Sequence, residues 1–241
     1  MNEYHRLSVS EFVESFCGWA ALTELVGMAK SERDRAFLAA LFLTGGRARE
    51  ALSLSKSNFE IREADGLILV RNMPLEKRYK KVEQITKADG SLGWRTEKML
   101  KFRKPFPIVL KEPLAPVLTG WIEKSSGPLF PSPYKPESPL SRHWAYHMIR
   151  ELDEDLPVSL RERLGVNRPF VAEGVKLAPH IHLWTHWFRS QRASQLVENY
   201  NYATEELIDY FSWEHYKTAL TYAKRGWRGL AAKMQSPVAY I

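Results

Sequence analysis

"TGGRAREALSL", from Thr44 to Leu54, carries two glycines between two helical patterns. It follows the apolar run "SERDRAFLAALFLT", in which Ser31 is a good N-cap and the body reads as a buried helix. Gly45 and Gly46 predict the end of that helix, because glycine readily adopts the left-handed backbone of a C-terminal cap. A second helix restarts at once in "RAREALSLS". Its apolar side is formed by Ala48, Ala51, Leu52 and Leu54.

The same stretch presents a charged pair beside the glycines. Arg47 stands in the first turn of the restarted helix, and Glu50 shares its face three residues later. A glycine turn lets a ligand approach closely, and an arginine fork suits bidentate binding of a phosphate. An exposed arginine paired with Glu50 would give the same pattern, so this stretch alone assigns no function.

Length and composition bound the class of protein. The 241 residues are enough for one large domain or two small ones, and 44% hydrophobic with 26% charged residues is an ordinary globular composition. No apolar run reaches the roughly 18 to 20 residues of a membrane span, and the polar start lacks a signal peptide. Cys17 is the only cysteine, which excludes an internal disulfide and a cysteine metal cluster. We therefore expect a cytoplasmic protein without membrane contact.

The charge favours a polyanionic partner. The formal net charge is +7 and the sequence pI is about 9.4, and nucleic acid is the commonest partner of such a chain. The basic residues gather in "EKRYKK" (76–81), "KMLKFRK" (98–104) and "YAKRGWR" (222–228). Each cluster could equally be a solvated face.

The pattern along the chain predicts a mainly α fold with a small antiparallel sheet, an α+β class. Residues 58–73 read as strand, turn and strand around Asp65-Gly66, and 102–110 as a later strand. The polar stretch between them, 76–100, predicts an extended hairpin or a loop insertion. Helices are expected over 8–16, 115–124, 141–156 (capped by Ser141), 186–200, 203–213 and 216–234.

The segment "SSGPLFPSPYKPESPL" divides the chain near residues 125–140. Its proline and serine content predicts a loop. We expect two sub-parts of one domain over 1–241 rather than separate domains. About forty residues precede Arg47 and read as that domain's first helices.

A histidine and an arginine recur in "HWFRSQRASQL". His186 and Arg189 stand at i and i+3 on one helical face, where they offer donors to one oxygen cluster and a group that moves a proton. A zinc site is the rival interpretation, because His180, His182 and His186 lie close together in "HIHLWTH". The stretch lacks the glutamate of a His-Glu-x-x-His motif, so we expect no metal.

Taken together, these segments resemble the tyrosine recombinase family of site-specific DNA integrases. "TGGRAREALSL" resembles the family's Thr-Gly-x-Arg-x-x-Glu-x-x-x-Leu box, and "HWFRSQRAS" its His-x-x-Arg box. "LFPSPYKPESPLSRHWAYHMIRELDEDL" resembles its Phe-Pro loop and the following helix. "YFSWEHYKTALTY" resembles its third box, in which a His or Trp precedes the tyrosine by nine residues. Trp213 plus nine is Tyr222, so the resemblance selects Tyr222 over Tyr216.

The chain departs from the family pattern in three places. Ser190 follows Arg189 where the family usually has a second histidine or lysine, and Ser212-Trp213 replaces the usual Gly-His. The turn that carries the family's lysine is expanded, and Lys77 is the nearest match. Its substitutes are Lys80, Lys81, Lys101 and Lys104.

The resemblance implies an enzyme that cuts and rejoins double-stranded DNA through a 3′-phosphotyrosyl intermediate, without metal, ATP or other cofactor. It implies that Arg47 and Arg189 hold the phosphate, Tyr222 attacks, His186 takes the proton, and Trp213 donates its indole N–H. Lys77 would protonate the leaving oxygen, and Glu50 would orient Arg47. The remaining DNA contacts are expected from Lys80, Lys81, Lys101, Lys104, Lys224 and Arg225.

The resemblance also implies an integrase of a mobile genetic element, and a homo-oligomer, because the family's members generally act as tetramers on paired sites. Many members carry an N-terminal helical DNA-clamping domain. None is evident here, where the residues before Arg47 read as the first helices of the catalytic domain, so this chain is either a fragment or lacks the clamp. Three alternatives stay open on the sequence. They are a DNA-binding relative that has lost its chemistry and acts as a regulator, a metal-dependent nuclease, and a type IB topoisomerase-like strand transferase.

Overall fold

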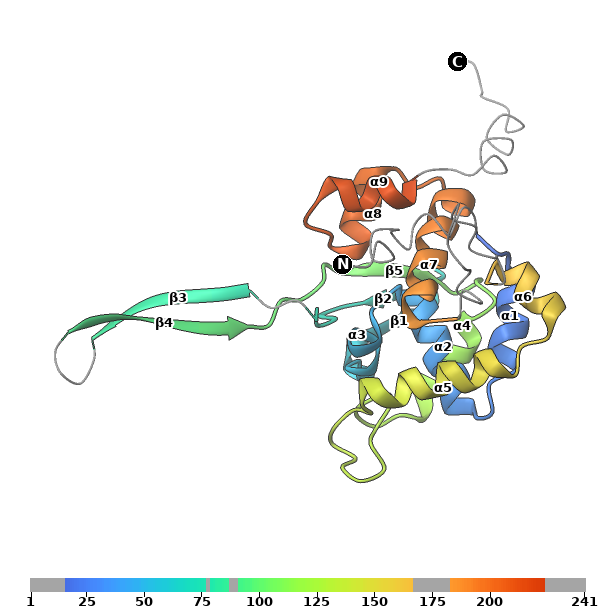
Figure 1. Cartoon of the computed structure of the whole chain (residues 1–241), viewed down its shortest axis with the longest axis horizontal. Helices are drawn as coiled ribbons and strands as arrows, with labels where there is room; N and C mark the ends of the chain where they lie inside the picture. Colours follow the sequence, from blue (N-terminus) through green and yellow to red (C-terminus); the bar gives the residue numbers. More distant parts are fainter. Residues whose placement is uncertain (1–15, 77–78, 87–90, 167–182, 224–241) are drawn as a thin grey trace, which may run out of the picture.

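A computed structural model of the chain describes residues 16–76, 79–86, 91–166 and 183–223 (Figure 1). The helices are α1 (Trp19–Gly27), α2 (Glu32–Thr44), α3 (Ala48–Leu52), α4 (Ala115–Lys124), α5 (Arg142–Glu154), α6 (Val158–Leu164), α7 (Thr185–Tyr200), α8 (Thr204–Phe211) and α9 (Tyr216–Ala223). The strands are β1 (Phe59–Arg62), β2 (Leu67–Val70), β3 (Tyr79–Thr86), β4 (Leu92–Met99) and β5 (Phe106–Val109). The predicted α+β class is confirmed.

Helix α2 is the centre of the core. Ser31 caps its N-terminus by accepting a hydrogen bond from the backbone N–H of Asp34 at 3.1 Å. Gly45 ends it in the left-handed conformation, at φ 56°. The helix packs against α1, α3, α4 and α7, and Phe37 and Phe42 are fully buried. Neighbours on several sides explain why its sequence is apolar over most of its surface.

The three-stranded sheet has the order β1-β2-β5 and is antiparallel. Phe59 pairs with Val70, and Val70 pairs with Phe106 on its other side. Val70 and Phe106 are buried, so this sheet closes the core. The predicted strand, turn and strand around Asp65-Gly66 is therefore confirmed, as is the later strand.

The polar insertion is an extended hairpin rather than a loop. Strands β3 and β4 pair only with each other, and the ribbon that they form projects far from the rest of the molecule (Figure 1). At its base the chain is closed by backbone bonds from Leu75 N–H to Lys101 O at 2.7 Å and from Arg103 N–H to Met73 O at 2.8 Å. The ribbon therefore begins from a fixed platform.

The proline-rich segment packs back onto the first half of the chain. The backbone N–H of Leu129 donates to Leu54 O at 2.9 Å, and the N–H of Lys56 donates to Gly127 O at 3.1 Å. Phe130 is buried edge-on against Phe37, with ring centroids 5.3 Å apart. The predicted loop is confirmed, and Ser141 caps α5 as expected.

Two helices were not predicted from the sequence. Neither α1, which follows Gly18, nor α6, which follows Pro157, begins with a side-chain cap, so the usual start signal is missing. The helix expected over 8–16 lies outside the described residues except for Phe16. The last expected helix, 216–234, is confirmed as α9 up to Ala223, and its remainder lies outside them. None of the described helices is long and apolar enough to cross a membrane.

Candidate active site

The glycine turn after α2 gives the site its shape. The carbonyl of Gly45 accepts a hydrogen bond from the Arg189 guanidinium at 2.7 Å, which joins the turn to α7. A side chain on Gly45 would collide with the ring of Phe211, and the backbone there has a positive φ. The glycine is therefore required both for the helix end and for the close approach of α8.

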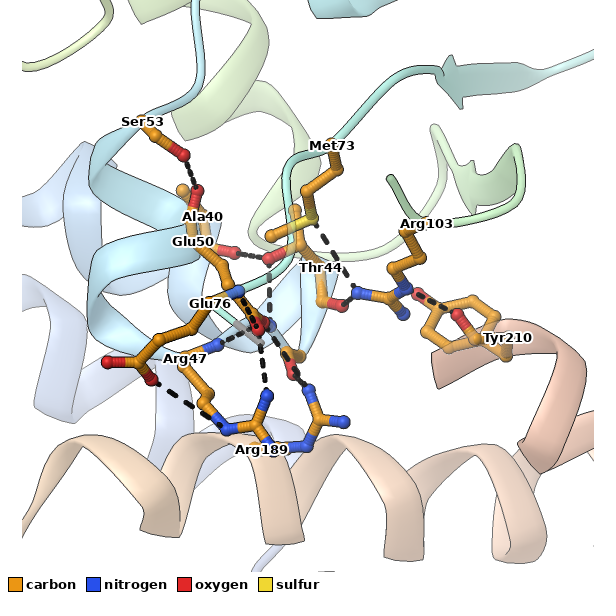
Figure 2. Close-up of polar contacts among 12 residues, drawn as sticks. Ala40, Thr44, Arg47, Glu50, Ser53, Met73, Glu76, Arg103, Arg189 and Tyr210 are labelled. Carbon is orange, nitrogen blue, oxygen red and sulfur yellow. Dashed lines mark hydrogen bonds and ion pairs between the residues drawn. The ribbon is translucent and has the colours of Figure 1, made fainter. Parts of the chain in front are cut away.

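A buried carboxylate holds two arginines together (Figure 2). Glu50 accepts from Arg47 twice, from its backbone N–H at 2.9 Å and from its guanidinium at 2.8 Å. Arg189 approaches the same carboxylate at 3.8 Å. Glu50 is fully buried, whereas about a third of the Arg47 side chain is exposed. Glu50 thus positions Arg47, as predicted, and also neutralises part of the charge of Arg189.

Burial and charge act in opposite directions on Glu50. Burial raises the pKa of its carboxyl group, but Arg189, the backbone N–H groups of Arg47 and Glu76, and the Arg47 guanidinium together bring the pKa below its ordinary value. Glu50 is therefore ionised at neutral pH.

Arg189 lies in an aromatic cradle. Its guanidinium carbon is 4.7 Å from the centroid of the Phe211 ring and 5.4 Å from that of Trp213. The two rings stack on each other with centroids 4.5 Å apart. Only 2% of the Arg189 side chain is exposed. Trp213 thus supports Arg189, a role that the sequence did not indicate, and it remains near enough to the site to contact a ligand.

His186 is held in its neutral form. Burial, together with the charges of Arg189 and Arg47, lowers the pKa of its imidazole to about 4 against the opposing effect of Glu50. The imidazole is therefore neutral at pH 7 and can accept a proton, although the same low pKa makes it a weaker base than an ordinary histidine.

One pocket of about 170 Å³ brings these groups together. Arg47, His186, Arg189 and Trp213 all line it, although they come from the α2–α3 turn, α7 and the segment after α8. Lys101, Glu214 and Thr218 line the same pocket. Four of the six catalytic residues predicted from the sequence therefore meet at one place.

Helix α9, which carries position 222, contributes to the lining of this pocket. Helix α9 packs against α7 and α8, and its Thr218 lines the pocket. Tyr222 follows Thr218 by one helical turn and so falls on the same face of α9. Tyr216 lies two residues before Thr218, on another face, and is half exposed.

The predicted lysines divide by location. Lys101 lines the pocket, and its ammonium donates to Glu214 at 2.7 Å. Lys104 instead pairs with Asp209 at 2.5 Å. Lys77 lies outside the described residues, although the backbone N–H of its neighbour Glu76 donates to Glu50 at 3.1 Å.

The remaining predicted DNA contacts lie on the ribbon or beyond the described part of the chain. Lys80 and Lys81 are on β3, where Lys81 pairs with Glu83. Lys224 and Arg225 lie outside the described residues, as do His180 and His182. Within the described residues, no group of three His, Cys, Asp or Glu side chains could hold a metal ion.

Arg103 is a supporting residue that the sequence did not reveal. It belongs to a basic cluster that could be a solvated face, yet only 2% of it is exposed. Its guanidinium donates to Thr44 O at 2.6 Å and to Tyr210 O at 2.5 Å (Figure 2), which ties the end of α2 to α8. No local signal distinguishes a buried arginine from the exposed lysines beside it.

A second buried network was also missed. Arg192 donates to Glu112 at 2.6 Å and to the hydroxyl of Tyr210 at 3.1 Å, and that hydroxyl donates to Leu43 O at 2.7 Å. Arg192 follows Arg189 by three residues, and this helical spacing was the available signal. The network fixes α7 and α8 against the end of α2, where the pocket opens.

The arrangement of these elements has counterparts among solved structures, although no family model and no curated protein matches the sequence. The chain has the fold of a tyrosine recombinase catalytic domain. The expected fold is therefore confirmed independently of the sequence motifs.

Two of the similar structures are XerH and XerA. The XerH site-specific recombinase, in a pre-cleavage complex with its difH substrate, matches with a TM-score of 0.55 and 13% identity over 96% of this chain and 56% of that one. XerA recombinase matches with a TM-score of 0.53 and 15% identity over 96% and 65%. The chain thus spans less than two thirds of the length of either structure.

Proposed function

We propose that this chain is a DNA strand transferase of the tyrosine recombinase kind, which cuts and rejoins double-stranded DNA through a covalent 3′-phosphotyrosyl intermediate. The observation that carries the proposal is the shared pocket of Arg47, His186, Arg189 and Trp213, beside the face of α9 on which Tyr222 falls. These residues come from distant parts of the sequence, so their meeting is not a consequence of local helical spacing.

The arginines would stabilise the charge that develops during the reaction. Attack on a phosphodiester adds negative charge to the nonbridging oxygens, and preorganised cations lower that barrier. Arg189 is held by Gly45 and Glu50, and Arg47 by Glu50. Both guanidinium groups are therefore oriented before DNA arrives, which avoids a cost of reorganisation in the transition state.

The proton balance follows from the neighbouring groups. The Tyr222 hydroxyl oxygen would form the bond to phosphorus while the bond from phosphorus to the 5′ oxygen breaks. The phenolic proton would pass to His186, which is unprotonated at pH 7 because its pKa is lowered. The leaving 5′ oxygen would take a proton from a lysine. The ester conserves the bond energy, so rejoining by the reverse steps requires no nucleotide.

Two lysines compete for the role of general acid. Lys77 is the residue that the motif selects, and Lys101 is the one that lines the pocket. A substrate with sulfur in place of the leaving 5′ oxygen separates them, because a thiolate leaves without protonation. We expect that substrate to restore cleavage in only one of the variants Lys77→Ala and Lys101→Ala, namely the one that lacks the general acid. It should not restore cleavage in Lys104→Ala, which is the control. Failure to restore either variant would exclude both Lys77 and Lys101 as the general acid.

The partner would be double-stranded DNA, bound by Lys80, Lys81, Lys101, Lys104, Lys224 and Arg225, with several copies of the chain on paired sites. The net charge of +7 supports such a partner, and the structure of XerH was solved with its DNA substrate.

The test is a covalent trap in EDTA. The protein is incubated with a pool of randomised duplexes that carry a nick, so that a cleaved strand diffuses away and rejoining fails. We expect a protein–DNA adduct that survives SDS. Adduct formation that requires a divalent metal would favour the nuclease alternative, and DNA binding without any adduct would favour a relative that has lost its chemistry.

A further inference from the structure

The β3–β4 ribbon is the part of the molecule that the site does not explain. Each strand has 8 residues, which corresponds to about 26 Å at 3.3 Å per residue. A two-stranded hairpin is marginally stable in water by itself. A ribbon that projects from the molecule, as in Figure 1, therefore calls for a surface to lie against.

The two faces of the ribbon differ in character. Residues opposite each other in an antiparallel pair share a face, and alternate residues change face. One face carries the exposed apolar residues Val82 (55%), Leu92 (67%) and Trp94 (70%). Positions 80 and 98, both lysine, pair with each other on that same face. No acidic residue occupies a position on this face of β3 or β4.

The other face balances its own charge. Lys81 pairs with Glu83 on the same strand, Glu83 stands opposite Arg95, and Lys81 stands opposite Glu97. Two acidic and two basic residues therefore compensate each other there. The asymmetry indicates that the apolar and basic face is the one that meets a partner, and that this partner is negatively charged.

Resting on the proposed function, we propose that this face of the β3–β4 ribbon lies in the major groove of the DNA beside the cleavage site. The major groove, about 12 Å wide, admits a two-stranded ribbon. The lysines at positions 80 and 98 would supply positive charge for the phosphates, and Trp94 with Val82 and Leu92 would supply apolar contact to base edges and thymine methyl groups.

The base of the β3–β4 ribbon adjoins the candidate active pocket. Leu75 and Lys101, which close the base by a backbone hydrogen bond, both line the candidate active pocket. A ribbon of about 26 Å covers most of a turn of B-DNA, which is about 34 Å long. The ribbon thus contacts base pairs within one helical turn of the scissile phosphate and sets the position of that phosphate.

The experiment measures affinity of the full chain for a 40-base-pair duplex of mixed sequence at several salt concentrations. The double variant Lys80→Ala/Lys98→Ala removes two charges from the proposed DNA face. Lys30→Ala/Lys124→Ala removes two charges from exposed ion pairs with Glu151 and Glu32 on the helical core and is its charge-matched control. Trp94→Ala is compared in the same way with Ile85→Ala, an apolar truncation on the opposite face. Thermal melts check that all four variants are folded.

We expect Lys80→Ala/Lys98→Ala to lower affinity about tenfold and to reduce the slope of log affinity against log salt by about 2. Trp94→Ala should lower affinity about fivefold with an unchanged salt slope. Both controls should stay within about twofold of the wild type. Equal losses in the DNA-face variants and their controls, or no loss in either, would overturn the proposal.

Two further measurements keep this proposal separate from the proposed function. Wild-type adduct formation in the nicked-duplex trap, together with unchanged affinity of the DNA-face variants, overturns the ribbon proposal alone. If only the DNA-face variants lose affinity for DNA and the wild type forms no adduct, the ribbon proposal is supported and the strand-transferase function is contradicted. Light scattering without DNA tests a third case, in which the ribbon binds a second copy of this chain. The wild type and the controls would then form an oligomer that the DNA-face variants do not form, while the DNA affinity of those variants stays unchanged. That result would overturn the proposal.

Discussion

Glu50 is the residue on which the candidate site depends most. It is buried, and it joins Arg47, Arg189 and the backbone of Glu76 through one carboxylate. The contact with Arg47 follows from their spacing of three residues and could be predicted. The contact with Arg189 could not, because it depends on how α7 packs against the glycine turn, which no local pattern encodes.

Substitution Glu50→Gln should destabilise the protein. It keeps the shape but leaves Arg189 without its carboxylate, so we expect a loss of about 2 kcal/mol in the free energy of unfolding. Urea unfolding measures this as a lower midpoint at constant slope. Glu60→Gln, which disrupts exposed ion pairs with Arg62 and Arg71, is the control and should leave the midpoint unchanged.

The same comparison has a defined dependence on pH. Because the pKa of Glu50 is lowered by folding, its carboxylate stabilises the native state above its ordinary pKa of about 4.3, and that stabilisation is lost as pH falls. The difference between wild type and Glu50→Gln should therefore shrink below about pH 4. A difference that grows on acidification would contradict the ionised, charge-paired state of Glu50.

His186 makes a second prediction about pH. With a pKa of about 4, its imidazole stays neutral and able to accept a proton through mildly acidic conditions. Adduct formation at subsaturating protein, which reports the free enzyme, should fall less than about twofold from pH 7 to 5.5. A histidine with the ordinary pKa near 6.5 would produce a fall of about eightfold. An eightfold fall in the wild type that disappears in His186→Gln would contradict the lowered pKa of His186.

At the scale of elements, the end of α2 matters most for the geometry of the site. Gly45→Ala should destabilise the chain by about 1 kcal/mol for the left-handed backbone and by a further 1–3 kcal/mol for the collision with Phe211. Gly66→Ala is the matched control, since Gly66 also has a positive φ but has open space around it. Equal destabilisation of the two variants in urea unfolding would show that the contact with α8 is unimportant.

The sequence predicted most elements because their signals are local. The cap at Ser31, the turn at Asp65-Gly66 and the cap at Ser141 each mark a boundary that the structure confirms. Helices α1 and α6 were missed because each combines a start without a side-chain cap with a short body, of 9 and 7 residues. The polar stretch between Glu76 and Leu100 fitted a hairpin or a loop equally well, and only the strand register of β3 and β4 decides between them.

The candidate site was predictable only in part. The spacing of His186 and Arg189 and the charged pair at Arg47 are visible in the sequence, whereas the buried position of Arg103 is not. Neither is the contact of Trp213 with Arg189, because the two residues lie on different elements. Long-range packing decides which cations are buried, and one sequence does not carry that information in any local window.

For the molecule as a whole, the pocket is a meeting point of four separate segments. The α2–α3 turn, the base of the ribbon, α7 and the segment from α8 to α9 each contribute lining residues. A pocket assembled in this way depends on the complete fold. Variants that disturb the fold should therefore lose any activity together with stability, so unfolding measurements must accompany every activity assay.

The most direct test of Tyr222 as the nucleophile is to identify the residue to which the DNA becomes covalently attached. Wild type, Tyr222→Phe and Tyr216→Phe are incubated in EDTA with the nicked duplex pool, and the adduct is mapped by proteolysis and mass spectrometry. We expect an adduct on Tyr222 in the wild type, an adduct of similar yield in Tyr216→Phe, and none in Tyr222→Phe, whose DNA affinity stays unchanged. An adduct that persists in Tyr222→Phe would contradict the central claim.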